Sequence, residues 1–256
     1  MILAIDMGNT HIELGLVDDQ GILMSERIKT DTNKTTTEYA VLLHTIFQIH
    51  QIDVKSIEGA IISSVVPPVV NLLRDAVKTV TGKTPLIVGP GVKNGLRLMI
   101  DNPKQLGSDF VVDAVGAIER YGAPLIIIDM GTATTYTYID ETKAFRGGTI
   151  MPGVRISLDA LVSGTAQLPR ISLDAPEHVV GTNTIASMSS GIVFGQASML
   201  DGMIDRICDE MQVDAPVIAT GGLSKLIVPH CRHKITIDHE LMLHGLKIIY
   251  DRNCGR

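Results

Sequence analysis

The N-terminal stretch Ile2-Leu-Ala-Ile-Asp6-Met-Gly8-Asn-Thr10 returns near the middle of the chain as Ile126-Ile-Ile-Asp129-Met-Gly131-Thr132-Ala. In both places an aliphatic run ends in Asp-Met-Gly, and a segment of alternating pattern follows at residues 12–17 and 135–139. This order predicts a strand, a turn and a second strand. Glycine lets the backbone approach a ligand closely, and Asn or Thr places a short polar side chain beside exposed N–H groups. We therefore predict two hairpins whose tips bind phosphate.

The rest of the chain alternates between strand and helix patterns. Glycine and proline pairs at 147–148 and 152–153 indicate turns. This alternation predicts an α/β fold in which helices cover mixed sheets, with two similar halves that meet near residue 122. The predicted strands are 59–65, 85–88 and 217–220, and the predicted helices are 39–48, 69–80, 104–121, 156–162, a long one after 184, and 241–250.

Composition narrows the class of protein. The 256 residues are 45% hydrophobic and 20% charged, which is typical of one or two folded domains and excludes a disordered chain. The net charge of -6 gives no overall positive field for nucleic acid or an anionic membrane, so we expect neither as a partner. Three scattered cysteines, no leader pattern and no apolar run of about 18 residues predict a cytoplasmic protein.

Other nucleotide-binding and metal-binding patterns fail on inspection. Gly82-Lys-Thr84 is no P-loop, because the glycine required five residues earlier is Val77. Gly89-Pro-Gly91 lacks the third glycine of a dinucleotide fingerprint, since position 94 is Asn94. The group His230, Cys231 and His233 has no second ligand pair and is better explained as a surface loop.

Several polar residues allow both a structural and a functional interpretation. Asp6 and Asp129 either bond their own turns or hold a cation and metal-bound phosphate, and the duplication favours the second reading. Asp109 opens a predicted helix, where it either complements the helix N-terminus or acts as a general base. One residue of 182–184 caps the long helix, and the same N–H groups suit an anion. Gly221-Gly222 forms either a plain turn or a close approach to a nucleotide.

The motifs together resemble type III pantothenate kinases. They occur in the order of that family, over nearly the whole chain. The resemblance implies two ribonuclease H-like halves, 1–122 and 123–256, each a mixed sheet with flanking helices, facing a central cleft. The motifs are Asp6 to Thr10, Ser63 to Pro68, Asp101 to Pro103, Gly107 to Asp109, Asp129 to Thr135, Gly147 to Gly153, and Leu168-Pro169.

The resemblance also implies an activity and its ligands. A member of this family is a homodimer that uses ATP, a divalent ion such as Mg²⁺ and a monovalent cation, K⁺ or NH₄⁺, to phosphorylate pantothenate in the first step of coenzyme A synthesis. Asp109 would be the base, Asp129 would bind the monovalent cation, and Asp6 would hold the divalent ion with ATP. The ATP-binding residues would be Asp6, Met7, Gly8, Asn9, Thr10, His11, Ile12, Glu13, Gly131 and Thr132, and the substrate-binding residues Ile100, Gly107, Ser108, Asp109, Phe110 and Thr184.

The departures from the family pattern gather around the acceptor. Ile100 stands where the family usually has Tyr, Phe110 where it has Arg, and Asp113 where it has Asn. An arginine beside the base suits a carboxylate, and Asp113 would raise the pKa of Asp109. We expect a pantothenate kinase whose carboxylate contact is supplied elsewhere, for instance by Arg155 or Arg170, from the same subunit or its partner. The alternatives are a kinase of the same fold for another hydroxyl compound and an ATP-binding regulatory protein.

The predicted long helix offers a surface for the dimer. Small residues recur along it and allow another helix to approach closely, while methionines supply adaptable packing. An intrachain core helix is the alternative explanation. The residues in question are Ser187, Met188, Ser190, Gly191, Gly195, Ala197, Met199, Gly202 and Met203.

Overall fold

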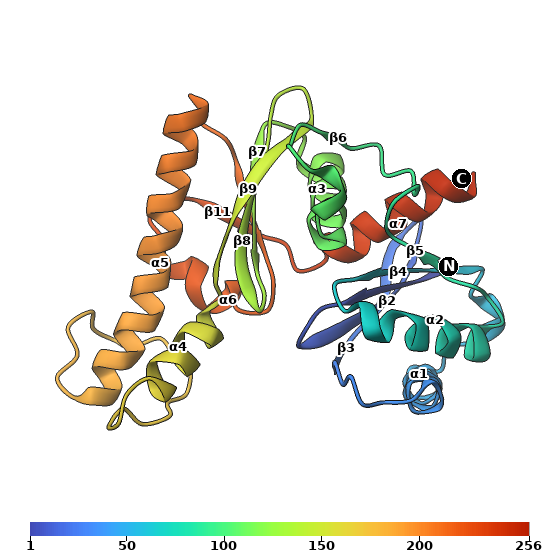
Figure 1. Cartoon of the computed structure of the whole chain (residues 1–256), viewed down its shortest axis with the longest axis horizontal. Coiled ribbons are helices and arrows are strands. Elements are labelled where there is room, and N and C mark those ends of the chain that lie inside the picture. The colour runs from blue at the N-terminus through green and yellow to red at the C-terminus, as the bar shows by residue number, and fades with distance from the viewer. Residues whose placement is uncertain (256) are drawn as a thin grey trace. The chain divides into compact units, whose positions relative to one another are not determined.

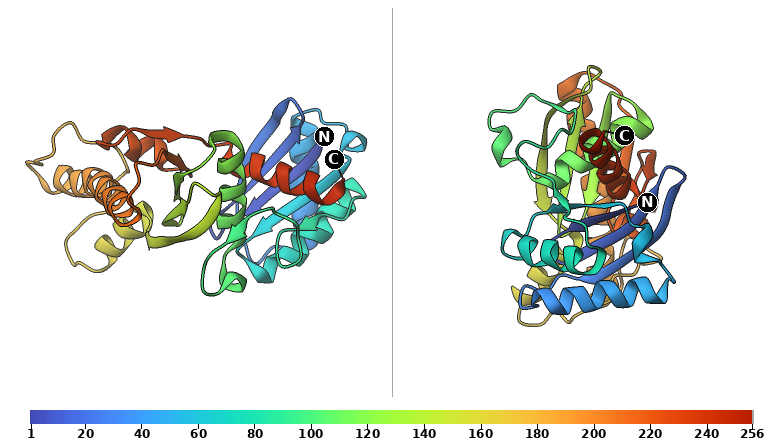
Figure 2. Two further views of the ribbon diagram at one scale, coloured as in Figure 1. Left: turned by 90° about the horizontal axis from the view of Figure 1, so that it is seen from above. Right: turned by 90° about the vertical axis from the view of Figure 1, so that its right-hand side faces the viewer.

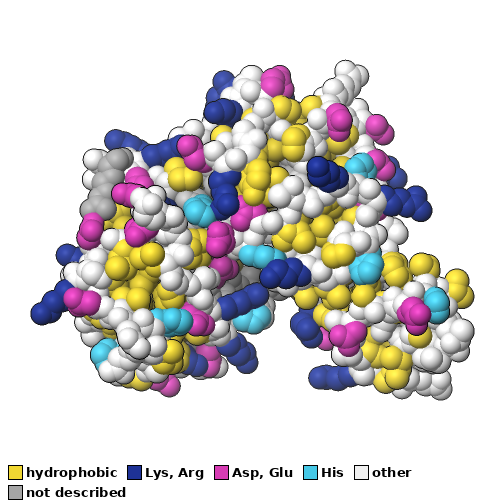
Figure 3. All heavy atoms as spheres, turned by 180° about the vertical axis from the view of Figure 1, so that it is seen from behind, with side chains coloured by type: hydrophobic (Ala, Val, Ile, Leu, Met, Phe, Trp, Pro, Cys, Tyr) yellow, Lys and Arg dark blue, Asp and Glu magenta, His cyan; other side chains and the backbone are white. Residues whose placement is uncertain are grey.

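The structure, a computed structural model, describes residues 1–255 and divides into two compact units (Figure 1). The first unit contains residues 1–96, 101–120 and the segment from 240 onward. The second unit contains residues 97–100 and 121–239. No helix in the described part of the chain is both long enough and apolar enough to cross a membrane. Acidic and basic side chains are interspersed over the face drawn in Figure 3.

The first unit is built on a five-stranded sheet in the order β3-β2-β1-β4-β5. The first hairpin motif supplies two antiparallel strands, β1 (Ile2–Met7) and β2 (His11–Asp18), and β3 (Gly21–Lys29) extends them. On the other side of β1, β4 (Gly59–Ser64) and β5 (Leu86–Ile87) run parallel to it. β1 is therefore a central strand, and its aliphatic residues are buried on both faces.

Helices cover both faces of this sheet. Leu3, Ile5 and Met7 share a hydrophobic core with α1 (Thr36–Ile49) and α2 (Pro67–Thr81). On the opposite face, Ile2 and Ala4 pack with α3 (Ser108–Tyr121) and α7 (Leu241–Cys254), and α7 crosses the strands in Figure 2. Short 3-10 turns lie at Val54–Ser56 and Pro103–Gln105. The sheet of this unit is thus packed between two apolar layers.

The second unit contains a six-stranded sheet in the order β11-β10-β7-β8-β9-β6. The second motif forms β7 (Leu125–Met130) and β8 (Ala133–Ile139), and β9 (Ala144–Pro152) continues the antiparallel set. β10 (Val217–Thr220) and β11 (Ile235–Ile237) run parallel to β7, while β6 (Arg97–Leu98) pairs with β9. One core joins this sheet to α4 (Val154–Ser163), α5 (Thr184–Met211), α6 (Ser224–Ile227) and the 3-10 turn Val228–His230.

The two sheets repeat one topology, which confirms the predicted α/β fold with a duplicated motif. In each unit the motif strand has an antiparallel hairpin partner on one side and two parallel strands on the other. The predicted helices and strands are all present, with ends that differ by a few residues. The compact units differ from the expected halves 1–122 and 123–256 mainly at α7, which packs on β1, β2 and β4 of the first unit.

One sequence prediction of a turn was wrong. Gly147 and Gly148 lie inside β9, opposite Tyr138 and Thr137, where the strand pairing shifts register by a bulge. Gly147 has a φ of +135°, and a Cβ on Gly148 would lie 1.9 Å from the carbonyl oxygen of Tyr136. Gly147 is therefore needed for its backbone conformation at the bulge, and Gly148 because the neighbouring strand approaches closely.

Candidate active site

The first hairpin tip, residues 8–11, is a tight turn closed by a hydrogen bond from Gly8 N–H to the His11 carbonyl, at 2.9 Å. Thr30, a buried residue beyond β3, braces this tip twice. Its hydroxyl donates to the Gly8 carbonyl at 2.7 Å, and its N–H donates to the Thr10 carbonyl at 3.0 Å. Asn9, Thr10 and His11 remain exposed, so the tip is rigid and accessible.

Two of the predicted ATP-binding residues have buried side chains. Met7 and Ile12 are fully buried in the core shared with α1 and α2. Their backbone groups are therefore the parts that a nucleotide could contact. Asp6 and Glu13 alternate with them on the opposite face of the sheet and are partly buried.

Asp6 and Glu13 are directly opposite each other on β1 and β2. Directly opposed residues in neighbouring strands have Cβ atoms about 5 Å apart on the same face of the sheet. Burial raises the pKa of Glu13, and the positive charge of Arg27 opposes that rise. The first hairpin thus carries a pair of carboxylates close to its tip.

The predicted base, Asp109, lies in the first turn of α3. Its Oδ1 accepts a hydrogen bond from the N–H of Phe110 at 2.9 Å. Burial raises the pKa of Asp109 above the usual value of an aspartate, and backbone N–H groups at the helix start oppose the rise. A partly desolvated carboxylate at the start of a rigid helix is suited to accept a proton.

Ser108 ties this helix to the sheet that carries Asp6. Its hydroxyl donates to the carbonyl of Ser64 at 3.1 Å, and it lies 3.2 Å from the N–H of Ser64 and 3.0 Å from the hydroxyl of Ser63. Ser63 is in register with Asp6 on the neighbouring parallel strand. Hydrogen bonds of Ser108 and the register of Ser63 therefore link the predicted base, Asp109, to the strand that carries the first hairpin motif.

Gly107 makes room for the carboxylate of Asp109. A Cβ on Gly107 would lie 2.3 Å from Oδ1 of Asp109, closer than real contacts allow. In this segment Gly107 makes space, Ser108 anchors the helix to the sheet and Asp109 carries the charge.

The residues that depart from the family pattern have different surroundings. Phe110 is partly buried beside Asp109, and Asp113 is buried on the next turn of α3. The pKa of Asp109 moves in the direction expected from Asp113, but burial is the cause. Ile100 belongs to the second unit, and so do Arg155 and Arg170, which are exposed.

The second hairpin repeats this arrangement with fewer charges. Asp129 is in register with Thr220 on the parallel strand and with Thr135 on the antiparallel strand. Gly221 has a φ of +86°, and its Cβ would lie 2.7 Å from Oδ1 of Asp129. Gly153 has as little room, because its Cβ would lie 2.3 Å from the Thr132 carbonyl oxygen. Two glycines thus pack directly against the tip that contains Gly131 and Thr132.

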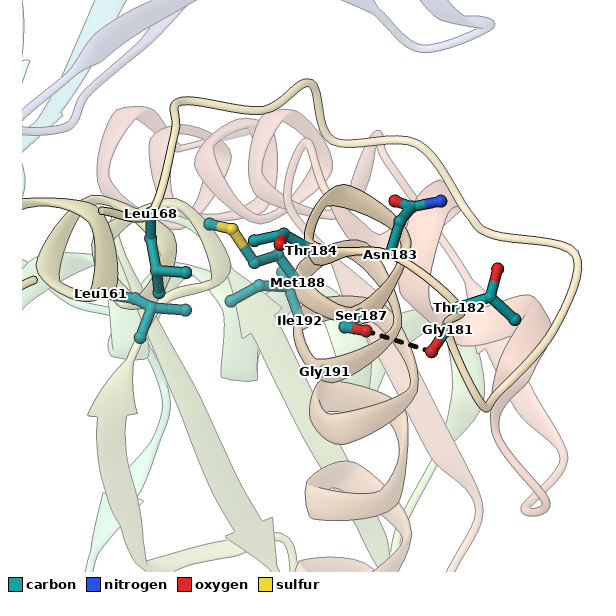
Figure 4. A pocket seen from close by; sticks show the side chains of 10 residues that line it. All are labelled: Leu161, Leu168, Gly181, Thr182, Asn183, Thr184, Ser187, Met188, Gly191 and Ile192. Carbon is teal, nitrogen blue, oxygen red and sulfur yellow. Dashed lines mark hydrogen bonds between the residues drawn. The ribbon is translucent and has the colours of Figure 1, made fainter.

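Thr184 lines a cavity of about 670 Å³ in the second unit (Figure 4). Asn183 caps α5 by accepting a hydrogen bond from Ala186 N–H at 2.9 Å, so it is the capping residue among 182–184. Ser187 donates to the Gly181 carbonyl at 3.2 Å and holds the preceding loop against the helix. The lining is mixed, with apolar Leu161, Leu168, Met188 and Ile192 and polar Thr182, Asn183, Thr184 and Ser187. In Figure 4 Thr184 lies beside Met188, whereas Thr182 and Asn183 lie on the side away from the two leucines.

The residues around the two hairpins differ in a way that suits different cations. The first hairpin offers two carboxylates, and Mg²⁺ is commonly bound by one or two carboxylates together with substrate phosphates. The second offers one carboxylate between two hydroxyl residues, which is less negative. Within residues 1–255 no group of three or more His, Cys, Asp or Glu forms a metal cage by itself. A divalent ion at Asp6 and Glu13 would therefore need phosphate oxygens as further ligands.

Comparison with known proteins decides the family. The sequence pattern described as type III pantothenate kinase matches residues 2–206. The type III pantothenate kinase of Exiguobacterium sibiricum is 47% identical over 99% of this chain and 100% of its own length. That of Halalkalibacterium halodurans is 46% identical over the same shares. This chain belongs to the type III pantothenate kinase family.

Solved structures agree with this at the level of the fold. The activator of 2-hydroxyisocaproyl-CoA dehydratase from Clostridium difficile, solved with bound ADPNP, has a TM-score of 0.58 at 14% identity and covers 99% of this chain and 96% of its own. Component A of the (R)-2-hydroxyglutaryl-CoA dehydratase of Acidaminococcus fermentans has a TM-score of 0.58 at 13% identity, with 97% and 96% covered. At these identities the likeness shows the shared two-lobed fold.

Several residues of this pantothenate kinase chain support the site without any signal in the sequence. Thr30 lies in a polar stretch and is found only through its bonds to Gly8 and Thr10. Thr220 is found only through its strand register with Asp129. Ser63 belongs to the sequence motif 63–68, but its register with Asp6 is seen only in the structure. Gly153 belongs to the sequence motif 147–153, but only the structure shows that it packs against the second hairpin.

Proposed function

We propose that this chain transfers the γ-phosphoryl group of ATP to the hydroxyl of pantothenate, with Asp109 as the general base. The observation that carries the proposal is the buried carboxylate of Asp109 at the start of α3, linked through Ser108 and Ser63 to the strand of Asp6. Membership of the type III pantothenate kinase family supports the choice of acceptor.

The chemistry follows from the carboxylate at the helix start. Phosphoryl transfer depends on charge neutralisation and on alignment of the attacking hydroxyl more than on covalent catalysis. Asp109 would accept the proton of that hydroxyl, and burial favours proton uptake by raising its pKa. The Phe110 N–H would keep the carboxylate in one orientation as it does so. Substrate contacts are assigned to Ile100, Gly107, Ser108, Phe110 and Thr184.

The nucleotide is assigned to the hairpins, with residues 6–13, Gly131 and Thr132 on ATP. Mg²⁺ would lie at Asp6, and once bound it would neutralise the charge of the phosphates. The less acidic position at Asp129 is proposed for K⁺ or NH₄⁺. We propose further that the protein is a cytoplasmic homodimer that pairs through α5, whose small residues allow close packing.

The test is ADP release from ATP and Mg²⁺ with purified protein, with and without pantothenate, in K⁺ and in Na⁺. We expect turnover that requires pantothenate, increases with K⁺ and is lost in Asp109→Asn. Asp75→Asn, a change in the surface pair with Arg74 on α2, is the matched control and should keep full activity. ATP binding without pantothenate turnover would contradict the proposal and favour another acceptor or a regulatory protein.

A further inference from the structure

A row of polar side chains crosses the first sheet close to the tip of its hairpin. Ser63 on β4, Asp6 on β1, Glu13 on β2 and Arg27 on β3 are successive register partners. Register partners in neighbouring strands point to the same face, so the four side chains lie side by side on the face covered further along by α3 and α7. We call these four residues the polar row.

Arg27 connects the polar row to the hairpin tip. A terminal guanidinium nitrogen of Arg27 donates to Nδ1 of His11 at 3.0 Å, and this sets His11 as an acceptor at that nitrogen. The same positive charge lowers the pKa of Glu13 against the effect of burial, so it acts within electrostatic reach of that carboxylate. Arg27 is itself exposed and therefore accessible to a ligand at the tip.

The charges at this end of the sheet need a cation. The polar row contributes the two carboxylates Asp6 and Glu13, and the phosphates proposed to bind at the tip are also negative. β3 brings Arg27 into the row and Lys29 opposite His11, both on the same face. Arginine is suited to phosphate because its planar fork donates two parallel hydrogen bonds to phosphate oxygens.

From this juxtaposition we infer that Arg27 binds the polyphosphate of the nucleotide at the first hairpin, with His11 holding its guanidinium over the tip. The inference rests on the proposed function only in taking ATP as the nucleotide, and it does not depend on the acceptor. A merely structural role would be pairing with Glu13 across the strands. The two roles differ in which ligands lose affinity when the arginine is removed.

The experiment measures the dissociation constants of ATP, ADP and adenosine by calorimetric titration in the presence of Mg²⁺. Arg27→Met should weaken ATP binding about 10- to 100-fold, as expected for the loss of charge-assisted hydrogen bonds, and leave adenosine binding unchanged. Arg27→Lys should recover part of the ATP affinity, because it keeps the charge and loses the fork. Arg74→Met, which removes the arginine of a surface ion pair on α2, is the matched control and should match the wild type for all three ligands.

The outcomes separate the possibilities. Wild-type ATP affinity in Arg27→Met would overturn the inference, and so would an equal loss for ATP and adenosine, which indicates general damage to the fold. His11→Ala should weaken ATP binding less than Arg27→Met does, because it removes only the contact that holds the guanidinium, and unchanged ATP affinity in His11→Ala would overturn the positioning role of His11. Failure of the proposed function gives a different result, namely no ADP release with pantothenate while the Arg27 dependence of ATP binding persists.

Discussion

Gly107→Ala is the most direct test of how the base is positioned. The backbone of Gly107 lies outside the left-handed region, so alanine is compatible with its conformation. The added Cβ would lie 2.3 Å from Oδ1 of Asp109, whereas ordinary contacts begin at 3.4 Å, so the oxygen must retreat by roughly 1 Å. This movement also weakens the hydrogen bond from the Phe110 N–H, which is 2.9 Å long.

The expected effect is on the rate and not on the fold. A misplacement of about 1 Å costs on the order of 100-fold in rate, or about 2.7 kcal/mol in activation free energy. The free energy of unfolding should change by less than about 1 kcal/mol, because the lower entropy of the unfolded chain with alanine offsets part of the local strain. The KM for ATP should not change, since the first hairpin is anchored by β1, β2 and Thr30.

The assay is steady-state ADP release with pantothenate, together with thermal unfolding of each variant. Gly89→Ala is the matched control, because nothing lies within 4 Å of its added Cβ. The double variant of Gly107→Ala and Asp109→Asn should be no slower than Asp109→Asn alone, since both changes act through one carboxylate. A wild-type kcat in Gly107→Ala, or additive losses in the double variant, would refute the role given to Asp109.

Three further predictions concern pH, the second hairpin and the long helix. Burial raises the pKa of Asp109, so folding disfavours its charged form. Asp109→Asn should therefore raise the melting temperature at neutral pH, and this gain should shrink as the pH falls and the wild-type carboxyl protonates. No gain at pH 7 in a thermal scan would contradict the burial argument. Gly221→Ala forces a side chain to a φ of +86° and against Asp129. A denaturant titration should show that the free energy of unfolding falls by more than about 1 kcal/mol. An assay in K⁺ and in Na⁺ should show that K⁺ stimulation is lost. Asn183→Ala removes the cap of α5 and should cost about 1 kcal/mol by the same titration, with Asn183→Ser retaining most of that stability.

Local sequence pattern was sufficient for the elements that carry the two motifs. β1 and β7 are aliphatic runs buried on both faces, and their hairpin turns are marked by Gly8 and Gly131. The helix that carries Asp109 was also predictable from its periodicity, although the predicted range 104–121 begins four residues before α3. In these places the residues that define the structure are adjacent in sequence.

Features that depend on distant partners could not be predicted in this way. β3 is an edge strand whose outward residues are polar, so the buried alternation typical of a strand is weak. Gly148 resembles a turn residue until the carbonyl of Tyr136 is found beside it. α7 was expected as a helix, but it packs in the first unit after the chain has passed through the second, and its own periodicity contains no information about that partner.

The proposed base and the proposed phosphate-binding tip of the first unit need opposite solvent environments. A proton-accepting carboxylate works best where burial raises its pKa, which is the situation of Asp109. A phosphate-binding tip must instead stay open to a charged ligand, and Asn9, Thr10 and His11 are exposed. Ser63 lies beside Asp6 in register and contacts Ser108, so it joins the buried and the exposed part without carrying a charge. Ser108→Ala should therefore disturb the base more than ATP binding, because it detaches the start of α3 and leaves the hairpin and its Thr30 brace intact.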